Sequence, residues 1–89
     1  MSSFDPDLPY QCAPSVALRP EPFGALAYDF STRRLSFLKS PELVKTVRAL
    51  ILNPDVHGAL DQAGVPAGQR RAYLTALAGL AEAGTIQPR

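Results

Sequence analysis

Hydrophobic and polar positions alternate along the chain between about residues 15 and 39. The alternating stretch divides into three segments, at about 15–19, 24–30 and 34–39, and Pro20 and Pro22 form a turn between the first two. A period of two residues is typical of strands that bury one face. We therefore predict a three-stranded antiparallel sheet in this part of the chain.

The predicted sheet is apolar on one face only. That face carries Val16, Leu18, Leu26, Tyr28, Phe30, Leu35 and Phe37. The other face carries smaller, polar or charged residues: Ser15, Ala17, Arg19, Ala25, Ala27, Asp29, Arg34 and Ser36. Because a small sheet with a bare apolar face is marginally stable, we expect the segment that follows to cover this face.

After residue 40 the hydrophobic period becomes helical. Ser40 is a suitable N-cap and Pro41 suits the first helical turn, and Asn53-Pro54 ends this helix and is a candidate cap for the next. We predict helices at about 41–52, 54–63 and 66–83, with the second ending at Gly64 and the third at Gly84. Their apolar stripes are Leu43, Val44, Val47, Leu50 and Ile51; Val56, Ala59, Leu60 and Ala63; and Tyr73, Leu74, Leu77, Leu80 and Ala81. The fold class is therefore α+β, a three-stranded antiparallel sheet followed by three helices.

The folded domain is expected to span residues 15–86. Residues 1–14 contain three prolines and little periodicity, which predicts an extended, flexible arm that Phe4 and Tyr10 can attach to the body. The last five residues are expected to be a tail.

Composition narrows the class of protein. The chain has 89 residues, 46% of them hydrophobic, with nine basic and eight acidic side chains, so it is one small domain without the basic excess of a sequence-independent nucleic-acid binder. Its single cysteine forms no internal disulfide, and no apolar run reaches the roughly 18 residues of a membrane span. We expect a cytoplasmic protein that does not associate with membranes.

The outer edge of the last predicted strand is a candidate binding feature. The strand is basic at both ends, at Arg34 and Lys39, and holds no proline. Those charges are typical of an edge protected against pairing. A second interpretation is that the edge and the third helix wall an apolar groove for an extended peptide, because the helix carries a row of small residues at Ala72, Ala76, Gly79 and Ala83. The pattern leaves both interpretations open.

Catalytic chemistry has little support in this sequence. His57 has no metal-binding partner at a suitable spacing, Cys12 has no basic neighbour in the sequence, and Tyr28 fits the core better than a ligand contact. The carboxylates nearest the proposed groove, Asp29 and Glu82, have no histidine beside them. We predict that the chain is not an enzyme and has no cofactor or metal.

Two stretches resemble a known family. VALRPEPFGALAYDF (16–30) and RRLSFLKSPELV (33–44) are similar to the peptide chaperones of mycofactocin biosynthesis. These belong to the recognition elements that bind the leaders of ribosomally made, post-translationally modified peptides. They are similar to the small chaperone of pyrroloquinoline quinone biosynthesis. The likeness extends over about residues 10–86.

The resemblance implies a winged helix-turn-helix-like domain that binds the leader of a precursor peptide as an added strand and presents it to a radical S-adenosylmethionine maturase. The iron-sulfur clusters and S-adenosylmethionine would then belong to that partner. The implied peptide-binding residues are Arg34, Leu35, Ser36, Phe37 and Leu38 on the strand, and Gln69, Arg70, Tyr73, Ala76, Leu77 and Leu80 on the helix.

The distribution of charged side chains indicates which kinds of partner the protein could bind. Between Asp29 and Arg48 there are five basic and two acidic side chains, which favours a positive rim that attracts an acidic leader, or else an ordinary solvated face. The alternative function is a winged-helix DNA-binding regulator, but the third helix offers two arginines followed mainly by alanine, leucine and glycine. We expect no nucleic-acid partner. A homodimer through the free strand edge stays open.

Overall fold

A three-stranded antiparallel sheet and three α-helices form the body of the protein. The structure is a computed structural model that describes residues 4–89. The strand order is β2-β3-β4, with β2 at Val16–Glu21, β3 at Gly24–Asp29 and β4 at Arg34–Leu38. The helices are α1 (Pro41–Ala49), α2 (Val56–Ala63) and α3 (Arg70–Glu82), with the 3₁₀ turns η1 (Leu50–Leu52) and η2 (Ala67–Gln69) between them. The α+β class predicted from the sequence is confirmed.

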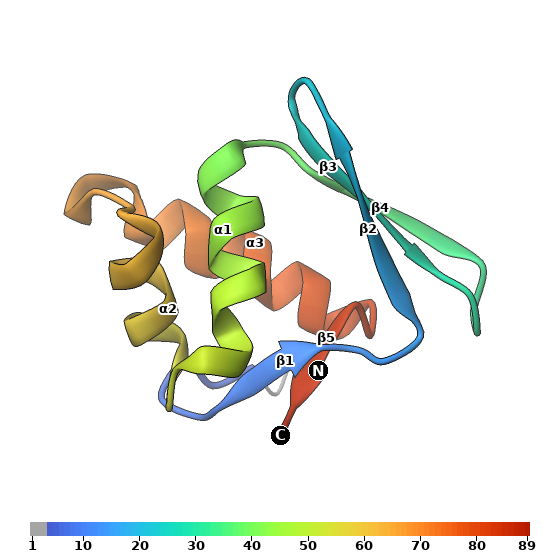
Figure 1. Ribbon diagram of the computed structural model, residues 1–89. Coiled ribbons are helices and arrows are strands. Elements are labelled where there is room, and N and C mark those ends of the chain that lie inside the picture. Colours follow the sequence, from blue (N-terminus) through green and yellow to red (C-terminus); the bar gives the residue numbers. More distant parts are fainter. Residues whose placement is uncertain (1–3) are drawn as a thin grey trace.

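The two ends of the chain pair with each other. β1 (Tyr10–Cys12) and β5 (Ile86–Pro88) form a separate antiparallel ribbon beyond the helices (Figure 1). Tyr10 is 2% exposed and Ile86 is 1% exposed, so both belong to the core. The described part of the expected arm is therefore packed on the body through Tyr10, and the expected tail is a strand. The sequence did not predict this ribbon, because a strand of three residues leaves almost no periodic signal and the prolines near it suggested an irregular segment.

Local sequence explains where the helices begin and end. The Leu43 amide donates to Ser40 Oγ at 3.0 Å, with Pro41 in the first turn, as predicted. The cap of α2 is Asp55, whose carboxylate accepts from the Gly58 amide at 2.8 Å, and not Asn53-Pro54. Gly64 ends α2 in the left-handed conformation that favours glycine.

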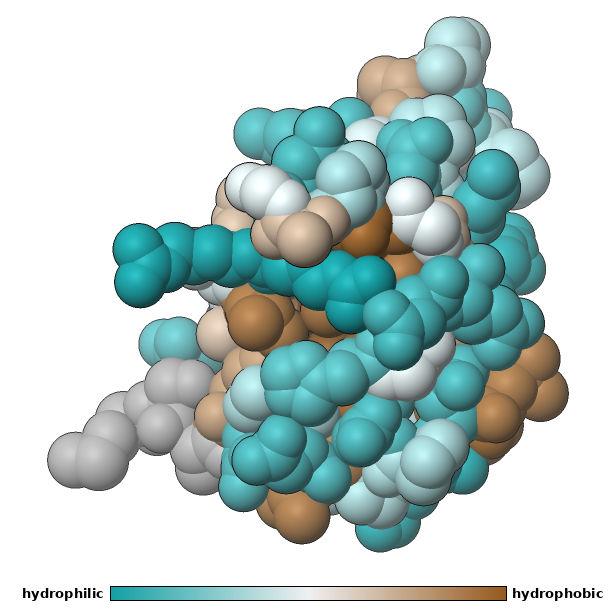
Figure 2. Space-filling model, turned by 90° about the vertical axis from the view of Figure 1, so that its left-hand side faces the viewer, coloured by the Kyte–Doolittle hydropathy of each residue, from teal (hydrophilic) through white to brown (hydrophobic). Residues whose placement is uncertain are grey.

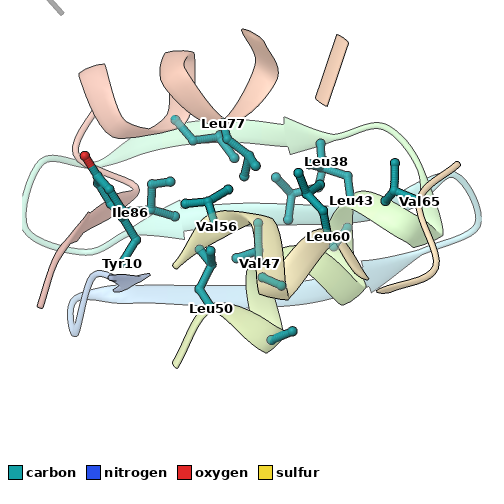
Figure 3. Packing of buried hydrophobic residues seen from close by; sticks show 14 residues of the cluster. Tyr10, Leu38, Leu43, Val47, Leu50, Val56, Leu60, Val65, Leu77 and Ile86 are labelled. Carbon is teal, nitrogen blue, oxygen red and sulfur yellow. The ribbon is translucent and has the colours of Figure 1, made fainter. Parts of the chain in front are cut away.

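The core lies between the sheet and the helices. Figure 3 shows Leu38 of β4 meeting α1, α2 and α3 through Leu43, Val47, Val56, Leu60 and Leu77, with Tyr10 and Ile86 closing one end. Each helix stripe predicted from the sequence supplies buried residues. Ile51, placed on the first stripe, is 50% exposed because the helix tightens into η1 before it.

Strands β3 and β4 present the opposite face to the helices from the one predicted. Ala25, Ala27 and Leu38 are buried on the face toward the helices, and Asp29, at the end of β3, is also buried. Leu35 is 51% exposed and Phe37 is 55% exposed, and both lie on the outer face. The expectation that the helices cover the large apolar residues of the last two strands was wrong.

Turn length accounts for this difference. A two-residue turn at Pro22 and Phe23 places Leu18 opposite Ala27, and the four-residue loop after Asp29 places Leu26 opposite Phe37. Residues directly opposite share a face, so Leu18 faces the helices while Leu26 and Phe37 face away. The prediction had grouped all three on one face.

Candidate functional site

The outer edge of β4 offers unpaired backbone groups. Within residues 4–89, β4 pairs only with β3. The Phe30 amide donates to the Ser15 carbonyl at 2.9 Å, which marks a hydrogen-bonded pair in the β2-β3 register. Such pairs recur at every second residue, so Tyr28 and Leu26 direct their backbone groups to β2, and Ala27 and Ala25 direct theirs to β4. On β4 the backbone groups of Ser36 and Leu38 are thus paired.

The N–H and C=O groups of Leu35 and Phe37 therefore point to the free edge. A guest strand would form its hydrogen bonds with these two residues. The β5 strand at the C-terminus, a candidate to block this edge, pairs with β1 instead.

The other edge of the sheet is less suitable for pairing. By the same alternation, Val16, Leu18 and Pro20 direct their backbone groups outward from β2. Pro20 has no amide hydrogen and so removes a donor from that edge, which is a common protection against strand addition. Of the two edge strands of the sheet, β4 is the one in which every outward-pointing residue inside the strand has a backbone N–H to donate.

The helical side of β4 is fixed by two contacts that the sequence did not reveal. The hydroxyls of Ser40 and Tyr73 are hydrogen-bonded at 2.7 Å, and those of Ser36 and Thr85 are 3.4 Å apart. Thr85 is buried. The first contact links the N-cap of α1, just after β4, to the first turn of α3, and the second links the middle of β4 to the segment that follows α3. Hydroxyl residues at these positions carry no period that would identify them in a single sequence.

The predicted site residues fall into two groups in the structure. Leu38, Leu77 and Leu80 are core residues, exposed by 0%, 0% and 7%, and can support a site only from beneath. The remainder are at least partly accessible: Arg34, Leu35, Ser36 and Phe37 on β4, and Gln69, Arg70, Tyr73 and Ala76 at or on α3. Tyr73 is the helix residue linked directly to the β4 segment.

The two arginines among the implied peptide-binding residues, Arg34 and Arg70, have different surroundings. Arg34 is exposed, as are Arg33 and Lys39, and none of these three has an ion pair within the described chain. Arg70 lies 2.6 Å from the Asp61 carboxylate and donates to the Val65 carbonyl. Arg70 therefore holds the start of α3 against the end of α2, and the free cations beside the strand edge are those at residues 33, 34 and 39.

The outer face of the sheet is a surface that the sequence prediction missed. Large apolar side chains gather there, including Phe23, Leu26, Tyr28, Leu35 and Phe37, and the rings of Phe23 and Phe37 meet edge to face at 6.1 Å. Two shallow hollows share Leu26, one bordered by Phe37 and the other by Leu35. Figure 2, which faces the opposite, helical side of the molecule, shows a mostly hydrophilic surface.

The reactive side chains singled out in the sequence have ordinary surroundings. Burial raises the pKa of the Cys12 thiol, and the nearby Arg48 opposes this shift only in part. His57 is 3.1 Å from the Asp7 carboxylate at the surface. Across residues 4–89 there is no cluster of three or more histidine, cysteine, aspartate or glutamate side chains suited to a metal ion. None of the helices in that range is both long enough and apolar enough to span a membrane.

The exposed face of α3 has few groups suited to DNA. Its exposed residues are Arg71, Ala72, Thr75, Ala76, Gly79 and Glu82. A recognition helix needs side chains that reach phosphates and base edges, and one arginine among small residues supplies little of either. The winged-helix regulator considered from the sequence therefore gains no support from the surface of this helix.

These features together describe a small α+β domain whose open strand edge suits the binding of an extended peptide. The sequence matches the Peptide chaperone MftB family over residues 9–87. It is 46% identical to the peptide chaperone MftB of Mycolicibacterium smegmatis, over 97% of this chain and 84% of that protein. It is 47% identical to the Mycobacterium tuberculosis protein of the same name, over 99% of this chain and 81% of that protein. No solved structure matches the chain.

The chain belongs to the Peptide chaperone MftB family. The resemblance found in the sequence is thereby confirmed, and the role is that of a peptide chaperone. A chaperone of this kind is not a catalyst, which confirms that the chain is not an enzyme.

Proposed function

We propose that this protein captures the leader of a ribosomally made precursor, the mycofactocin precursor peptide, as a strand added to β4. It then presents the peptide to a radical S-adenosylmethionine maturase in the cytoplasm. The observation that carries the proposal is the free edge at Leu35 and Phe37 in a member of a peptide chaperone family. Backbone hydrogen bonds would supply affinity, and alternate side chains of the guest would supply selectivity.

The position of β4 supports this mode of binding. β4 is held by its pairing with β3, by the Ser36–Thr85 contact at its middle and by the Ser40–Tyr73 contact just after it, so the edge is ordered before a guest arrives. A preformed edge lowers the entropy cost of binding, because only the peptide has to become ordered. The exposed cations at residues 33, 34 and 39 favour a leader with acidic residues.

A backbone block tests the proposal directly. Leu35→Pro removes an amide that points outward and leaves the bonds between β3 and β4 in place. We expect the synthetic precursor peptide to bind this variant about five- to 150-fold more weakly, because an unmade hydrogen bond at an interface costs about 1–3 kcal/mol. Leu35→Ala is the matched control, since it removes most of the side chain but keeps the amide, and it should bind the peptide more tightly than Leu35→Pro does.

Titration of ¹⁵N-labelled protein with the same peptide provides the second measurement. Shift changes should centre on residues 33–39 and on the part of α3 near Tyr73. Equal peptide affinity of wild type and Leu35→Pro, with shift changes away from β4, would contradict strand addition. Presentation to the maturase is tested separately, by whether Leu35→Pro lowers maturation of the precursor in a reconstituted reaction.

A further inference from the structure

The apolar outer face of the sheet is concentrated at the β4 edge. On β4, Leu35 and Phe37 are 51% and 55% exposed, whereas Leu26 and Tyr28 on β3 are half-buried. On β2 the same face carries Ala17 and the charged Arg19. A second sheet stacked on this face would cover all three strands. The observed asymmetry suits instead a single strand added beside β4.

The exposed side chains and the free backbone groups belong to the same two residues. Leu35 and Phe37 direct their N–H and C=O groups to the open edge and their side chains to the outer face. A guest residue paired with either one places its side chain on that same face, within contact distance of Leu35 or Phe37. Two such guest residues are separated by one residue, because side chains of a strand alternate between faces.

Charge at the edge argues against a second copy of this chain as the occupant. Antiparallel pairing of two β4 edges through Leu35 and Phe37 would place Arg33 of one copy opposite Lys39 of the other, at both ends of the contact. Like charges directly opposite each other destabilise a strand pair. All three cations of this edge, Arg34 included, are exposed. They favour a guest that carries acidic residues outside its apolar pair.

We propose that the outer face of the sheet, at Leu35 and Phe37, selects precursor segments with two large apolar side chains two residues apart and acidic residues at the flanks. This rests on the proposed function, since the guest must first pair with β4. The backbone of β4 then provides general affinity for extended peptides, and the outer face provides sequence preference. Phe37 has the larger role, because its side chain is larger than that of Leu35 and its ring lies against Phe23.

The test uses Phe37→Thr and Leu35→Thr, which keep the backbone donors and a residue suited to strands. Leu52→Thr is the control, because Leu52 is 69% exposed in η1, outside the sheet. With the synthetic precursor peptide, calorimetry should give about five- to tenfold weaker binding for Phe37→Thr and a smaller loss for Leu35→Thr. Leu52→Thr should bind as the wild type does.

An alanine scan of the precursor provides the second arm. We expect two sensitive apolar positions, two residues apart, and one of them should lose its sensitivity in the Phe37→Thr background. If both threonine variants bind normally while the amides of Leu35 and Phe37 still shift on titration, strand addition stands and the outer-face proposal falls. If the wild-type protein binds no precursor, the proposed function falls with it.

Sedimentation of the same variants tests whether a second copy of this chain, and not a peptide, occupies the outer face. The proposal expects no self-association that depends on Phe37 at the concentrations used for binding. A wild-type dimer that Phe37→Thr disrupts, with peptide affinity unchanged, would identify the face as a contact between copies and overturn the proposal.

Discussion

Replacing Gly24 by alanine should destabilise the protein strongly, although the added group is a single methyl. Gly24 begins β3 with φ at +153°, a conformation that side chains rarely adopt. An added Cβ would lie 2.1 Å from the Leu38 carbonyl oxygen and 3.0 Å from the Ser40 nitrogen. Restoring ordinary contact would require the end of β4 to move by about 1 Å.

The expected loss follows from two terms. Backbone strain at such a conformation costs about 1–3 kcal/mol, and overpacking against fixed backbone costs a similar amount. The sum of about 2–6 kcal/mol is a large part of the 5–15 kcal/mol that stabilises a typical domain. For a chain of this size the melting temperature should fall by about 10–50 °C.

Urea and thermal unfolding followed by circular dichroism measure this effect, and Gly79→Ala is the matched control. Gly79 lies in α3, is exposed, and an added Cβ there meets nothing within 4 Å. Because glycine in a helix interior costs about 1 kcal/mol relative to alanine, the control should be more stable than the wild type. A Gly24→Ala protein within about 0.5 kcal/mol of wild type would refute the packing argument.

Three further outcomes test other parts of the structure. Ser40→Ala should lower the free energy of unfolding by about 1 kcal/mol or more, because α1 loses its cap. In urea unfolding, the double variant with Tyr73→Phe should lose less stability than the two single variants summed, because the two side chains share one hydrogen bond. Additive losses would contradict the shared bond. Hydrogen bonds from Ser15 and then Ser31 lower the pKa of Asp29 to about 2, so the stability it contributes is complete above about pH 4 and is lost as pH falls toward 2. Asp29→Asn should remove that part of the acid dependence in urea titrations at pH 6 and pH 2.5, and an identical acid loss in both proteins would exclude this carboxyl as its source. Cys12 should react slowly with a disulfide reagent at neutral pH, because burial raises the pKa of its thiol. As pH is raised, its reaction rate should still increase at pH values where the rate of an unperturbed thiol has become constant. Rapid labelling at pH 7 would contradict the burial of this thiol.

Much of the fold follows from local sequence signals. The strand segments, the Ser40 cap and the glycine that ends α2 were predicted because each depends on residues close together in the chain. The β1-β5 ribbon was missed because it joins the two ends of the chain through strands of three residues each. Pairing at such a separation leaves no mark in a single sequence.

The candidate edge was identified from the sequence, but its surroundings were not. The order of three consecutive strands with short connections predicts that the last strand has an open side. Which face of that strand meets the helices depends on turn geometry. Each of the two loops contains an even number of residues, so even-numbered positions on one strand share a face with odd-numbered positions on the next. The hydrophobic pattern of the strands, taken alone, does not contain this information.

The small residues of β3 are explained by the face that β3 presents to the helices. Ala25 and Ala27 allow the helical layer to approach the sheet, and Leu38 then completes the core from β4. Leu35 and Phe37 are left on the outside, beside their own unpaired backbone groups. Had the large residues of β3 and β4 faced inward, the β4 edge would still be unpaired, but the outer face of these two strands would carry alanine, serine and charged residues, with Leu38 as the one large apolar side chain. In the proposed mode of binding, backbone pairing and side-chain recognition therefore depend on the same two residues, and a change at either should affect both how tightly and how selectively a peptide is held.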